Sequence, residues 1–242
     1  MGRRTPAGPP RNGLCIVDKP LGATSMHVIR VVRRAAENHR TGHAGTLDPL
    51  ATGVLVVCLG KATKSVERLM GLTKVYEAAV DLSAFTATDD AEGPREAVDV
   101  PEPPSRAAIE ASLPGFTGLI EQQPPVYSAL KVGGRPAYAY ARKGQDVELA
   151  PRKVRIDTIE VLDYSWPLLS LRIVCGRGTY IRSLARQLGE ALGTGGHLAA
   201  LRRTAVGPYT VEQAVKLDAL PQPLLQEHLI ECEEVGAAKD KP

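Results

Sequence analysis

The sequence lacks any long hydrophobic run. Its longest uninterrupted apolar stretch is Val54 to Leu59, far shorter than the roughly 20 residues that cross a bilayer. The first residues, MGRRTPAGPPRNG, carry basic side chains with no apolar segment behind them, which is unlike a signal peptide. The sequence therefore predicts a cytoplasmic protein without a membrane span, and a disordered leader over residues 1–12.

Cysteine is scarce and scattered. The four cysteines, Cys15, Cys58, Cys175 and Cys232, form no CxxC pair and have no histidine at zinc-finger spacing. Three of them lie in apolar, strand-like contexts (LCIV, LVVCLG, RIVCG), where cysteine behaves as a small hydrophobic residue. We expect reduced cysteines, with no disulfide framework and no zinc site.

Basic residues only slightly outnumber acidic residues, which gives a net charge of +3. It is unevenly distributed, since residues 206–242 hold 3 Lys and 7 acidic residues and leave +7 on residues 1–205 (27 minus 20). A basic main body is compatible with an anionic partner such as nucleic acid, although many unrelated enzymes have a similar excess.

Hydrophobic periodicity predicts strands and helices in an order that is not strictly alternating. A short buried strand (LCIVDKP) precedes a helix that begins at Thr24-Ser25 and continues through Ala36. The later elements are strands at 54–59, 74–82, 152–164 and 168–175 and helices at 62–70 and 178–193. The segment 84–105 is rich in Pro, Gly and acidic residues, which predicts a long loop or an excursion from the core. Because the strands are not each followed by a helix, we predict an α+β fold with a mixed, mostly antiparallel sheet flanked by helices.

One acidic residue, Asp48 in GHAGTLDPLATG, stands apart from other acids in a turn flanked by glycines. A Walker A loop is excluded, because Gly60-Lys61 has Leu55 at the first glycine position and is followed by Ala62. An Asp-x-Asp phosphoryl-transfer site is unsupported, because Leu50 occupies the second position. No second carboxylate is near enough in sequence for a local glycosidase pair. Two interpretations remain open, a cap of the turn and a lone carboxylate nucleophile.

The run GHAGTLDPLATGVLVVCLGKATK resembles the catalytic motif of the bacterial tRNA pseudouridine synthase B (TruB) family. The similarity continues in order through DKPLGATS, KVYEAAVDL, TATDDAEG, QPPVYSALKVGGRPAYAYARKG, GRGTYIRSLARQLGEALG and GHLAALRRTAVGPY. It covers the chain from Gly13 to about Leu220, so the resemblance implies a catalytic domain over residues 13–220 with the pseudouridine synthase fold. Residues 221–242 are expected to form a short acidic C-terminal tail.

The resemblance implies that Asp48 is the nucleophile in converting uridine 55 of the TΨC loop of tRNA to pseudouridine. The N1–C1′ bond breaks, the uracil turns while it is still held, and C5 joins C1′. The sequence leaves open whether Asp48 attacks C1′ or C6 or assists a glycal route. The resemblance implies no cofactor and no metal.

Other site residues follow from the resemblance alone. Tyr76 matches a tyrosine that lies against the target base and helps to remove the C5 proton, and Arg182 matches the arginine that pairs with the catalytic aspartate. The positions that line the pocket and contact RNA correspond to His43, Tyr180, Leu201 and, with a looser match, Asp90. The target nucleotide must be flipped out, because its C1′ atom and both faces of its base are inaccessible within a stack.

The expected partner is the T-arm stem-loop of tRNA, with no membrane and no obligate protein partner. The segment LKVGGRPAYAYARKG (130–144) corresponds to an insertion that closes on the RNA, and its basic residues either contact phosphates or form a solvated surface: Lys131, Arg135, Arg142 and Lys143. Only 33 residues follow Tyr209 (242 minus 209), too few for the PUA RNA-binding domain of many members. Binding that is weaker or more sensitive to salt is the resulting prediction.

The sequence departs from the family at Ala44, where Thr is common, at Ala87, where an acid is common, and at Ser83, where Gly often ends the strand of Tyr76. Two other functions remain as alternatives. One is a tRNA-folding chaperone that keeps the pocket for binding, and the other is a pseudouridine synthase for another RNA with a T-loop-like hairpin.

Overall fold

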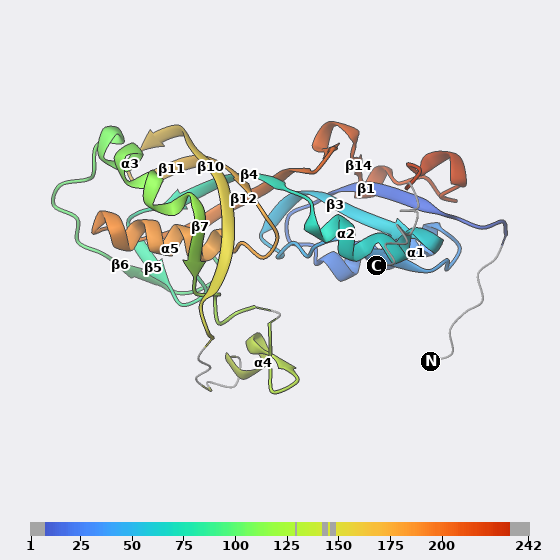
Figure 1. Cartoon of the computed structure of the whole chain (residues 1–242), viewed down its shortest axis with the longest axis horizontal. Helices are drawn as coiled ribbons and strands as arrows, with labels where there is room; N and C mark the ends of the chain where they lie inside the picture. The colour runs from blue at the N-terminus through green and yellow to red at the C-terminus, as the bar shows by residue number, and fades with distance from the viewer. Residues whose placement is uncertain (1–7, 129, 142–144, 146–148, 233–242) are drawn as a thin grey trace, which may run out of the picture. The chain divides into compact units, whose positions relative to one another are not determined.

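The computed structural model describes residues 8–128, 130–141, 145 and 149–232, and the chain forms two compact units (Figure 1). Unit 1 comprises residues 1–74 and 202–242, and unit 2 comprises residues 75–201. The predicted catalytic domain, residues 13–220, is thus divided between the two units, and unit 1 is built from both ends of the chain.

Unit 1 is built around β1, which is hydrogen-bonded to its neighbours on both edges. It runs antiparallel to β3, with Cys15 opposite Val57, and parallel to β14, with Val17 opposite Val215. The helices and strands of this unit are β1 (Gly13–Lys19), α1 (Ser25–Ala35), β2 (Thr41–His43), β3 (Ala51–Leu59), α2 (Val66–Gly71), β13 (Tyr209–Thr210) and β14 (Val215–Lys216). Strand β12 (His197–Val206) contributes its residues 202–206 to this unit.

Both faces of the β1–β3 pair are buried, which explains why these strands are almost continuously apolar. Side chains that alternate along a strand point to opposite faces, so Cys15 and Val17 pack with Val28 of α1, while Leu14 and Ile16 pack with Leu69 of α2. The predicted start of α1 is confirmed, since the Thr24 hydroxyl accepts a hydrogen bond from the His27 N–H at 3.0 Å. The predicted helix at 62–70 is a 3₁₀ helix (Gly60–Ser65) that continues into α2.

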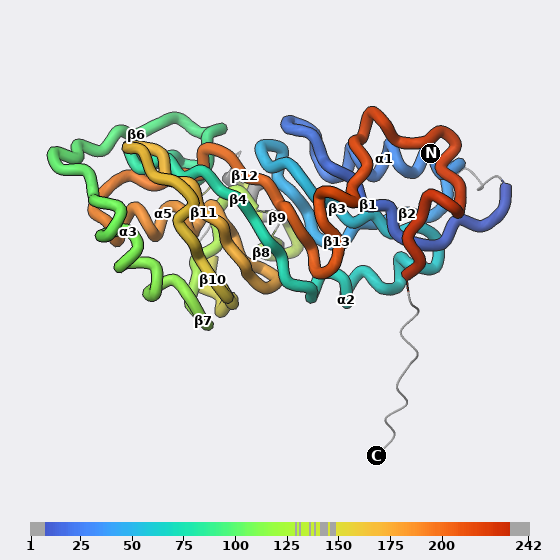
Figure 2. Tube along the Cα trace, turned by 90° about the horizontal axis from the view of Figure 1, so that it is seen from above, coloured from blue at the N-terminus to red at the C-terminus, as the bar shows by residue number. Residues whose placement is uncertain are grey.

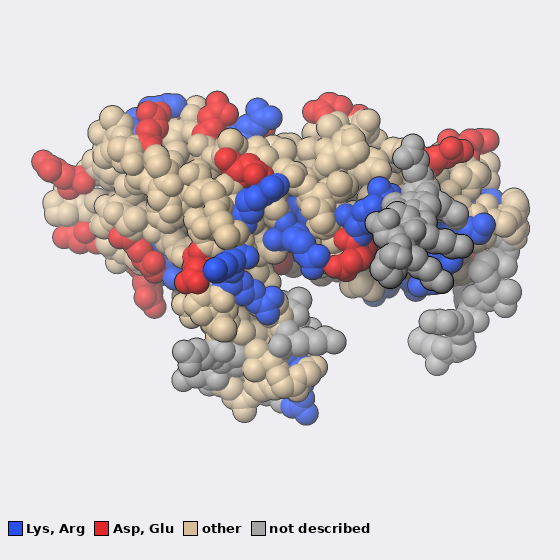
Figure 3. Space-filling model, viewed as in Figure 1, with Lys and Arg blue, Asp and Glu red and all other residues tan. Residues whose placement is uncertain are grey.

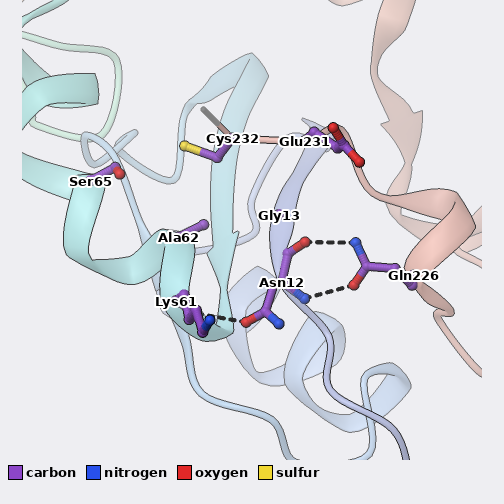
Figure 4. Close-up of a pocket in the computed structure, with 8 residues that line it drawn as sticks. All are labelled: Asn12, Gly13, Lys61, Ala62, Ser65, Gln226, Glu231 and Cys232. Carbon is purple, nitrogen blue, oxygen red and sulfur yellow. Dashed lines mark hydrogen bonds between the residues drawn. The ribbon is translucent and has the colours of Figure 1, made fainter. Parts of the chain in front are cut away.

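The last residues of the expected leader belong to the fold of unit 1. Arg11 is buried and donates to the Leu224 carbonyl at 2.9 Å. Gln226 bonds to both the N–H and the carbonyl of Asn12, at 2.8 and 2.7 Å (Figure 4). The prediction of a disordered leader is therefore wrong for Arg11 and Asn12, because long-range hydrogen bonds hold them. Residues 1–7 lie outside the described part of the chain.

The expected C-terminal tail is likewise packed as far as the structure describes it. Leu224 and Leu229 join the core beside α1, and Ile230 forms an antiparallel bridge with Leu14. Figure 2 shows this red segment beside the blue N-terminal trace. Residues 221–232 are therefore part of unit 1, and residues 233–242 lie outside the described residues.

Unit 2 contains a second part of the sheet, in the order β12, β4, β11, β10, β7, with β12 contributing residues 197–201. The long strand β10 pairs antiparallel with both β11 and β7. Its helices and strands are β4 (Lys74–Asp81), β5 (Ala84–Thr86), β6 (Arg95–Ala97), α3 (Arg106–Ser112), β7 (Gly118–Gln122), β8 (Lys131–Val132), β9 (Arg135–Pro136), α4 (Ala137–Ala141), β10 (Arg152–Ser165), β11 (Leu168–Cys175) and α5 (Ile181–Leu192).

Several predictions for unit 2 are confirmed. Strands β4, β10 and β11 and helix α5 lie where periodicity placed them, and α5 ends at Gly193, whose φ of 67° suits glycine. Of the two alternatives for the segment 84–105, a long loop or an excursion from the core, the simple loop is excluded, because β5 and β6 form a hairpin within it, with Ala84 opposite Ala97. Short strands of this kind carry too few residues for alternation to be visible.

The mixed, mostly antiparallel sheet with flanking helices confirms the predicted α+β class. The chain between β7 and β10 holds β8, β9 and α4, and among its basic residues Arg135 is exposed, whereas Arg142 and Lys143 lie outside the described residues. All four cysteines are free, and Cys15, Cys58 and Cys175 are buried as predicted. Nowhere in the described chain is a helix both long enough and apolar enough to traverse a bilayer.

Candidate active site

Asp48 lies in the connection between β2 and β3, two strands that pair antiparallel with His43 opposite Val57. The connection begins at Gly45, whose φ of 101° is in the region that favours glycine. The Asp48 carbonyl accepts a hydrogen bond from the Ala51 N–H at 3.1 Å, so Asp48 occupies a tight turn just before β3. We call residues 45–54 the Asp48 segment.

Three side chains from elsewhere in unit 1 hold alternate carbonyls of the Asp48 segment. Arg203 Nη2 donates to the Gly45 carbonyl at 3.2 Å, Ser25 Oγ donates to the Leu47 carbonyl at 2.9 Å, and Lys19 Nζ donates to the Pro49 carbonyl at 3.3 Å. Ser25 Oγ also accepts from the Leu47 N–H at 2.9 Å.

These three residues come from β12, α1 and β1 respectively. The backbone on both sides of Asp48 is thus fixed by side chains that the fold brings together from three elements.

Lys19 is fully buried and supplies positive charge beside Asp48. Its ammonium also donates to the carbonyls of Pro20 at 3.0 Å and Ala23 at 2.6 Å, so three acceptors surround its three N–H groups. Burial lowers the pKa of Lys19 to about 8, while the nearby Asp48 charge raises it and the Arg203 charge lowers it further. Asp48, Lys19 and Arg203 therefore influence one another electrostatically.

His43 precedes the Asp48 segment, and its surroundings lower its pKa. Burial lowers its pKa first and the Arg203 charge second, while a hydrogen bond with Gly45 opposes both. Among the described residues, its buried Nδ1 atom has no hydrogen-bond partner. An imidazole ring can stack on a base.

In unit 2, the start of α5 is fixed by the buried residue Gln122 at the end of β7. The Gln122 amide accepts from the Tyr180 N–H at 2.7 Å and donates to the Tyr180 carbonyl at 3.0 Å. One turn further along, Ser183 Oγ donates to the Gln123 carbonyl at 2.8 Å. These contacts set the position of Tyr180 and of the residue two places later, Arg182.

Arg182 is buried and pairs with Asp90, its Nη1 lying 3.3 Å from Asp90 Oδ2. The same guanidinium donates to the Thr88 carbonyl at 3.2 Å and the Tyr127 carbonyl at 3.0 Å. Asp90 also accepts from Thr88 Oγ1 at 2.6 Å and from the Glu92 N–H at 3.0 Å. Asp90 thus has a definite role within unit 2, as the carboxylate partner of Arg182.

A second ion pair lies beside the first. Arg186, one turn along α5 from Arg182, is 3.2 Å from the carboxylate of Asp89. Burial raises the pKa of Asp89, and the Arg186 charge and hydrogen bond oppose that rise.

The residues predicted for the site fall into two groups. Asp48 and His43 belong to unit 1, and the remainder belong to unit 2, where Tyr76 is buried in β4: Tyr76, Asp90, Tyr180, Arg182 and Leu201. The structure brings Arg182 together with Asp90, and the pairing of Arg182 with Asp48 stays a prediction.

The sequence analysis missed the roles of Ser25, Arg203 and Gln122. Two of them carried a weak signal. In a strand, successive side chains point to opposite faces, so one of the two arginines in LRRT had to point inward. A polar Gln that ends a strand next to two prolines is likewise a candidate for a buried backbone contact.

The sequence is similar to protein families and individual proteins of known name over most of its length. Residues 33–181 match the TruB family pseudouridylate synthase N-terminal domain, and residues 182–234 match the tRNA pseudouridylate synthase B C-terminal domain. A protein of Xanthomonas axonopodis pv. citri named tRNA pseudouridine synthase B is 48% identical over 211 residues, which cover 87% of this chain and 68% of that one. The protein of the same name from Thermobifida fusca is 51% identical over 223 residues, covering 86% and 74%.

Solved structures agree with this assignment. A Cbf5-Nop10-Gar1 complex contains a chain 33% identical to this one, with a TM-score of 0.68 and coverage of 87% of this chain and 54% of that chain. An H/ACA RNP bound to a substrate RNA containing 2′-deoxyuridine contains a chain 31% identical, with a TM-score of 0.64 and coverage of 86% and 52%. The present chain thus spans about half the length of these two structural relatives. With nearly its whole described length matched by the two family domains, the chain belongs to the TruB family of pseudouridylate synthases.

Proposed function

We propose that this protein isomerises a uridine of the TΨC loop of tRNA, position 55, to pseudouridine, with Asp48 as the nucleophile. The observation that supports Asp48 is the Asp48 segment, whose Gly45, Leu47 and Pro49 carbonyls are each bonded to a side chain from another element. A backbone fixed in this way gives a reacting carboxylate one position, which is how enzymes reduce the entropic part of a barrier. The choice of tRNA rests on the relatives named tRNA pseudouridine synthase B.

In the proposed reaction the N1–C1′ bond breaks and the C5–C1′ bond forms. The proton on C5 leaves to solvent and N1 gains a proton, so no atom other than hydrogen is exchanged. Tyr76 assists removal of the C5 proton, and Arg182 orients the Asp48 carboxylate.

We further propose that His43, Tyr180, Leu201 and Asp90 line the site of the flipped nucleotide. His43 suits this role because burial and the Arg203 charge lower its pKa, which favours the neutral imidazole, and such a ring can stack on a base. Asp90 contributes through Arg182, whose guanidinium it holds. The T-arm stem-loop is the proposed partner, read mainly by shape and phosphate contacts.

The test is tritium release from unmodified tRNA labelled at uridine C5. The protein should release tritium, and sequencing should map the product to position 55. Asp48→Asn should abolish release while tRNA binding persists, because the amide keeps the shape of the side chain and loses its nucleophilic charge. Asp18→Asn is the matched control, since Asp18 is a carboxylate of the same unit whose partner is the half-exposed Arg202, and it should remain active.

Continued release by Asp48→Asn would exclude the nucleophile assignment. Release with a product mapped to another RNA, and none in tRNA, would retain the activity and replace the substrate. Loss of release without loss of a folding benefit to tRNA would point to the chaperone alternative as an additional role.

A further inference from the structure

Two consecutive arginines of β12 have opposite environments. Arg202 faces outward, where its guanidinium bonds both oxygens of Asp18 at 3.1 and 2.8 Å and its side chain is 38% exposed. Arg203 is only 1% exposed, so it does not contribute to the surface charges that Figure 3 displays. Surface charges are screened by salt within about 10 Å at 0.1 M, whereas a buried charge is screened much less.

The backbone of Arg203 is held against β3 by a contact that only glycine permits. A Cβ atom on Gly53 would lie 2.2 Å from the Arg203 carbonyl oxygen and 2.9 Å from the Arg203 nitrogen, and Gly53 has a φ of 98°. Both the spacing and the conformation require glycine at this point. The start of the Arg203 side chain is therefore placed by strand packing rather than by the side chain's own contacts.

From this position the guanidinium reaches both ends of the Asp48 segment. Arg203 Nε donates to the Val54 carbonyl at 2.8 Å, and Nη2 donates to the Gly45 carbonyl at 3.2 Å. Gly45 lies in the connection between β2 and β3 and Val54 is the fourth residue of β3, so one planar group joins the start of the Asp48 segment to the strand at its other end. A lysine has a single charged nitrogen on a flexible stem and lacks this rigid fork.

A buried guanidinium bonded to carbonyls costs desolvation energy that an apolar side chain of similar size would avoid. Its presence here calls for a benefit other than stability. We propose that Arg203 is a positioning residue, which closes the Asp48 segment at both ends and so fixes the carboxylate for attack on the uridine. This inference rests on the proposed function for its catalytic consequence, but its geometric part is independent of it.

The same side chain has an electrostatic effect on His43. The Arg203 charge acts with burial to lower the His43 pKa, so the two effects of Arg203, closure of the segment and neutrality of His43, can be separated by substitution. Arg203→Lys keeps the positive charge and loses the fork, while Arg203→Met loses both. Arg202→Met removes the neighbouring arginine of the same strand and serves as the control.

Steady-state tritium release over a range of tRNA concentrations and imidazole titration by NMR, with His43→Gln to assign the signal, test the inference. Arg203→Met should lower kcat by about 100-fold, the loss expected for a displacement of about 1 Å in a reacting group, with KM for tRNA little changed. Its His43 pKa should rise toward the ordinary value. Arg203→Lys should show a similar loss of kcat with a His43 pKa that stays low, and Arg202→Met should match the parent in both measurements.

A folded Arg203→Lys protein with parental kcat would overturn the positioning role, even if Arg203→Met fails to fold. A change in thermal stability alone, with kcat and the His43 titration unaltered in both variants, would show a merely structural arginine and would also overturn it. If Asp48→Asn remained active, the proposed nucleophile would be wrong whatever the Arg203 variants do. The His43 titration does not depend on catalysis. It can therefore test the effect of Arg203 on His43 even if the proposed function of the protein is wrong.

Discussion

Buried positive charge is held differently around Asp48 in unit 1 and at the start of α5 in unit 2. Around Asp48 in unit 1, the buried cations Lys19 and Arg203 are bonded to backbone carbonyls. In unit 2, the buried Arg182 pairs with Asp90, and Arg186 pairs with Asp89. Backbone carbonyls accept the hydrogen bonds of a cation but do not neutralise its charge, whereas a carboxylate does both. Net positive charge thus lies near Asp48, whereas Arg182 and Arg186 each lie in a pair with a carboxylate.

The largest expected loss of stability in unit 1 comes from a substitution at Gly53, where β3 packs against the backbone of Arg203 in β12. Gly53→Ala should lower the free energy of unfolding by about 4 kcal/mol or more, because it adds a left-handed alanine, about 1–2 kcal/mol, to a clash in a close-packed sheet. Denaturant titration measures the loss. Gly22→Ala is the control, with a φ of 77° but no atom within 4 Å of the added Cβ, so it should show the strain alone.

Hydrogen exchange on Gly53→Ala sharpens the comparison between units. Amides of β1 and β3 should lose protection first, while those of β10 and β11 keep theirs. Equal loss in all four strands would mean that the units unfold as one body.

The corresponding break in unit 2 is Asp90→Asn. Removing the charge of Asp90 takes away the buried carboxylate that lies 3.3 Å from the Arg182 guanidinium, and such a loss typically costs about 3 kcal/mol. Chemical denaturation should show this loss, and Glu110→Gln, in an exposed i,i+4 pair with Arg106, should change stability by well under about 1 kcal/mol. If the two variants proved equally stable, the buried pair would contribute nothing.

The pH dependence of stability distinguishes a cation held by carbonyls from one held by a carboxylate. The pKa of Lys19 is lowered to about 8 in the folded protein, so between about pH 8 and 10.4 the unfolded chain binds more protons at this site. Stability should therefore rise with pH across that window, by about 1–3 kcal/mol relative to Lys19→Met. Parallel pH profiles of the two proteins would contradict the expectation.

The smallest expected effect is a direct electrostatic one. The Asp48 charge raises the pKa of Lys19, so Asp48→Asn should lower that pKa below about 8. Lysine side-chain NMR, with Lys19→Met to assign the signal, measures the shift. Asp18→Asn should leave the Lys19 titration closer to that of the parent, and a larger shift in that variant would place the dominant carboxylate elsewhere.

Local patterns were sufficient to predict much of the fold. The Thr24 cap located α1, the apolar run located β3, and alternation located β10, because each depends on neighbours within a few residues. The order of the motifs also led to the family, which the matches to its two domains confirm.

What the sequence could not reveal depends on contacts between distant residues. Arg203 lies 158 positions from Gly45, and Arg11 lies 213 positions from Leu224. Periodicity gives no information about such distant pairs. The sequence therefore placed Arg11 in a leader and gave no role to Arg203. Only the family resemblance placed Asp90 near the site, and only the three-dimensional structure shows that it pairs with Arg182.

The composition of unit 1 from both ends of the chain has a consequence for the order of folding. Unit 2 is one continuous stretch, residues 75–201, whereas unit 1 needs residues up to 74 and from 202 onward. Domains generally fold as units during synthesis, the N-terminal parts first, but the Asp48 segment is made early and its tie to Arg203 arrives only after all of unit 2. During translation the Asp48 segment is therefore not held by Arg203 until the ribosome has completed unit 2 and synthesised β12.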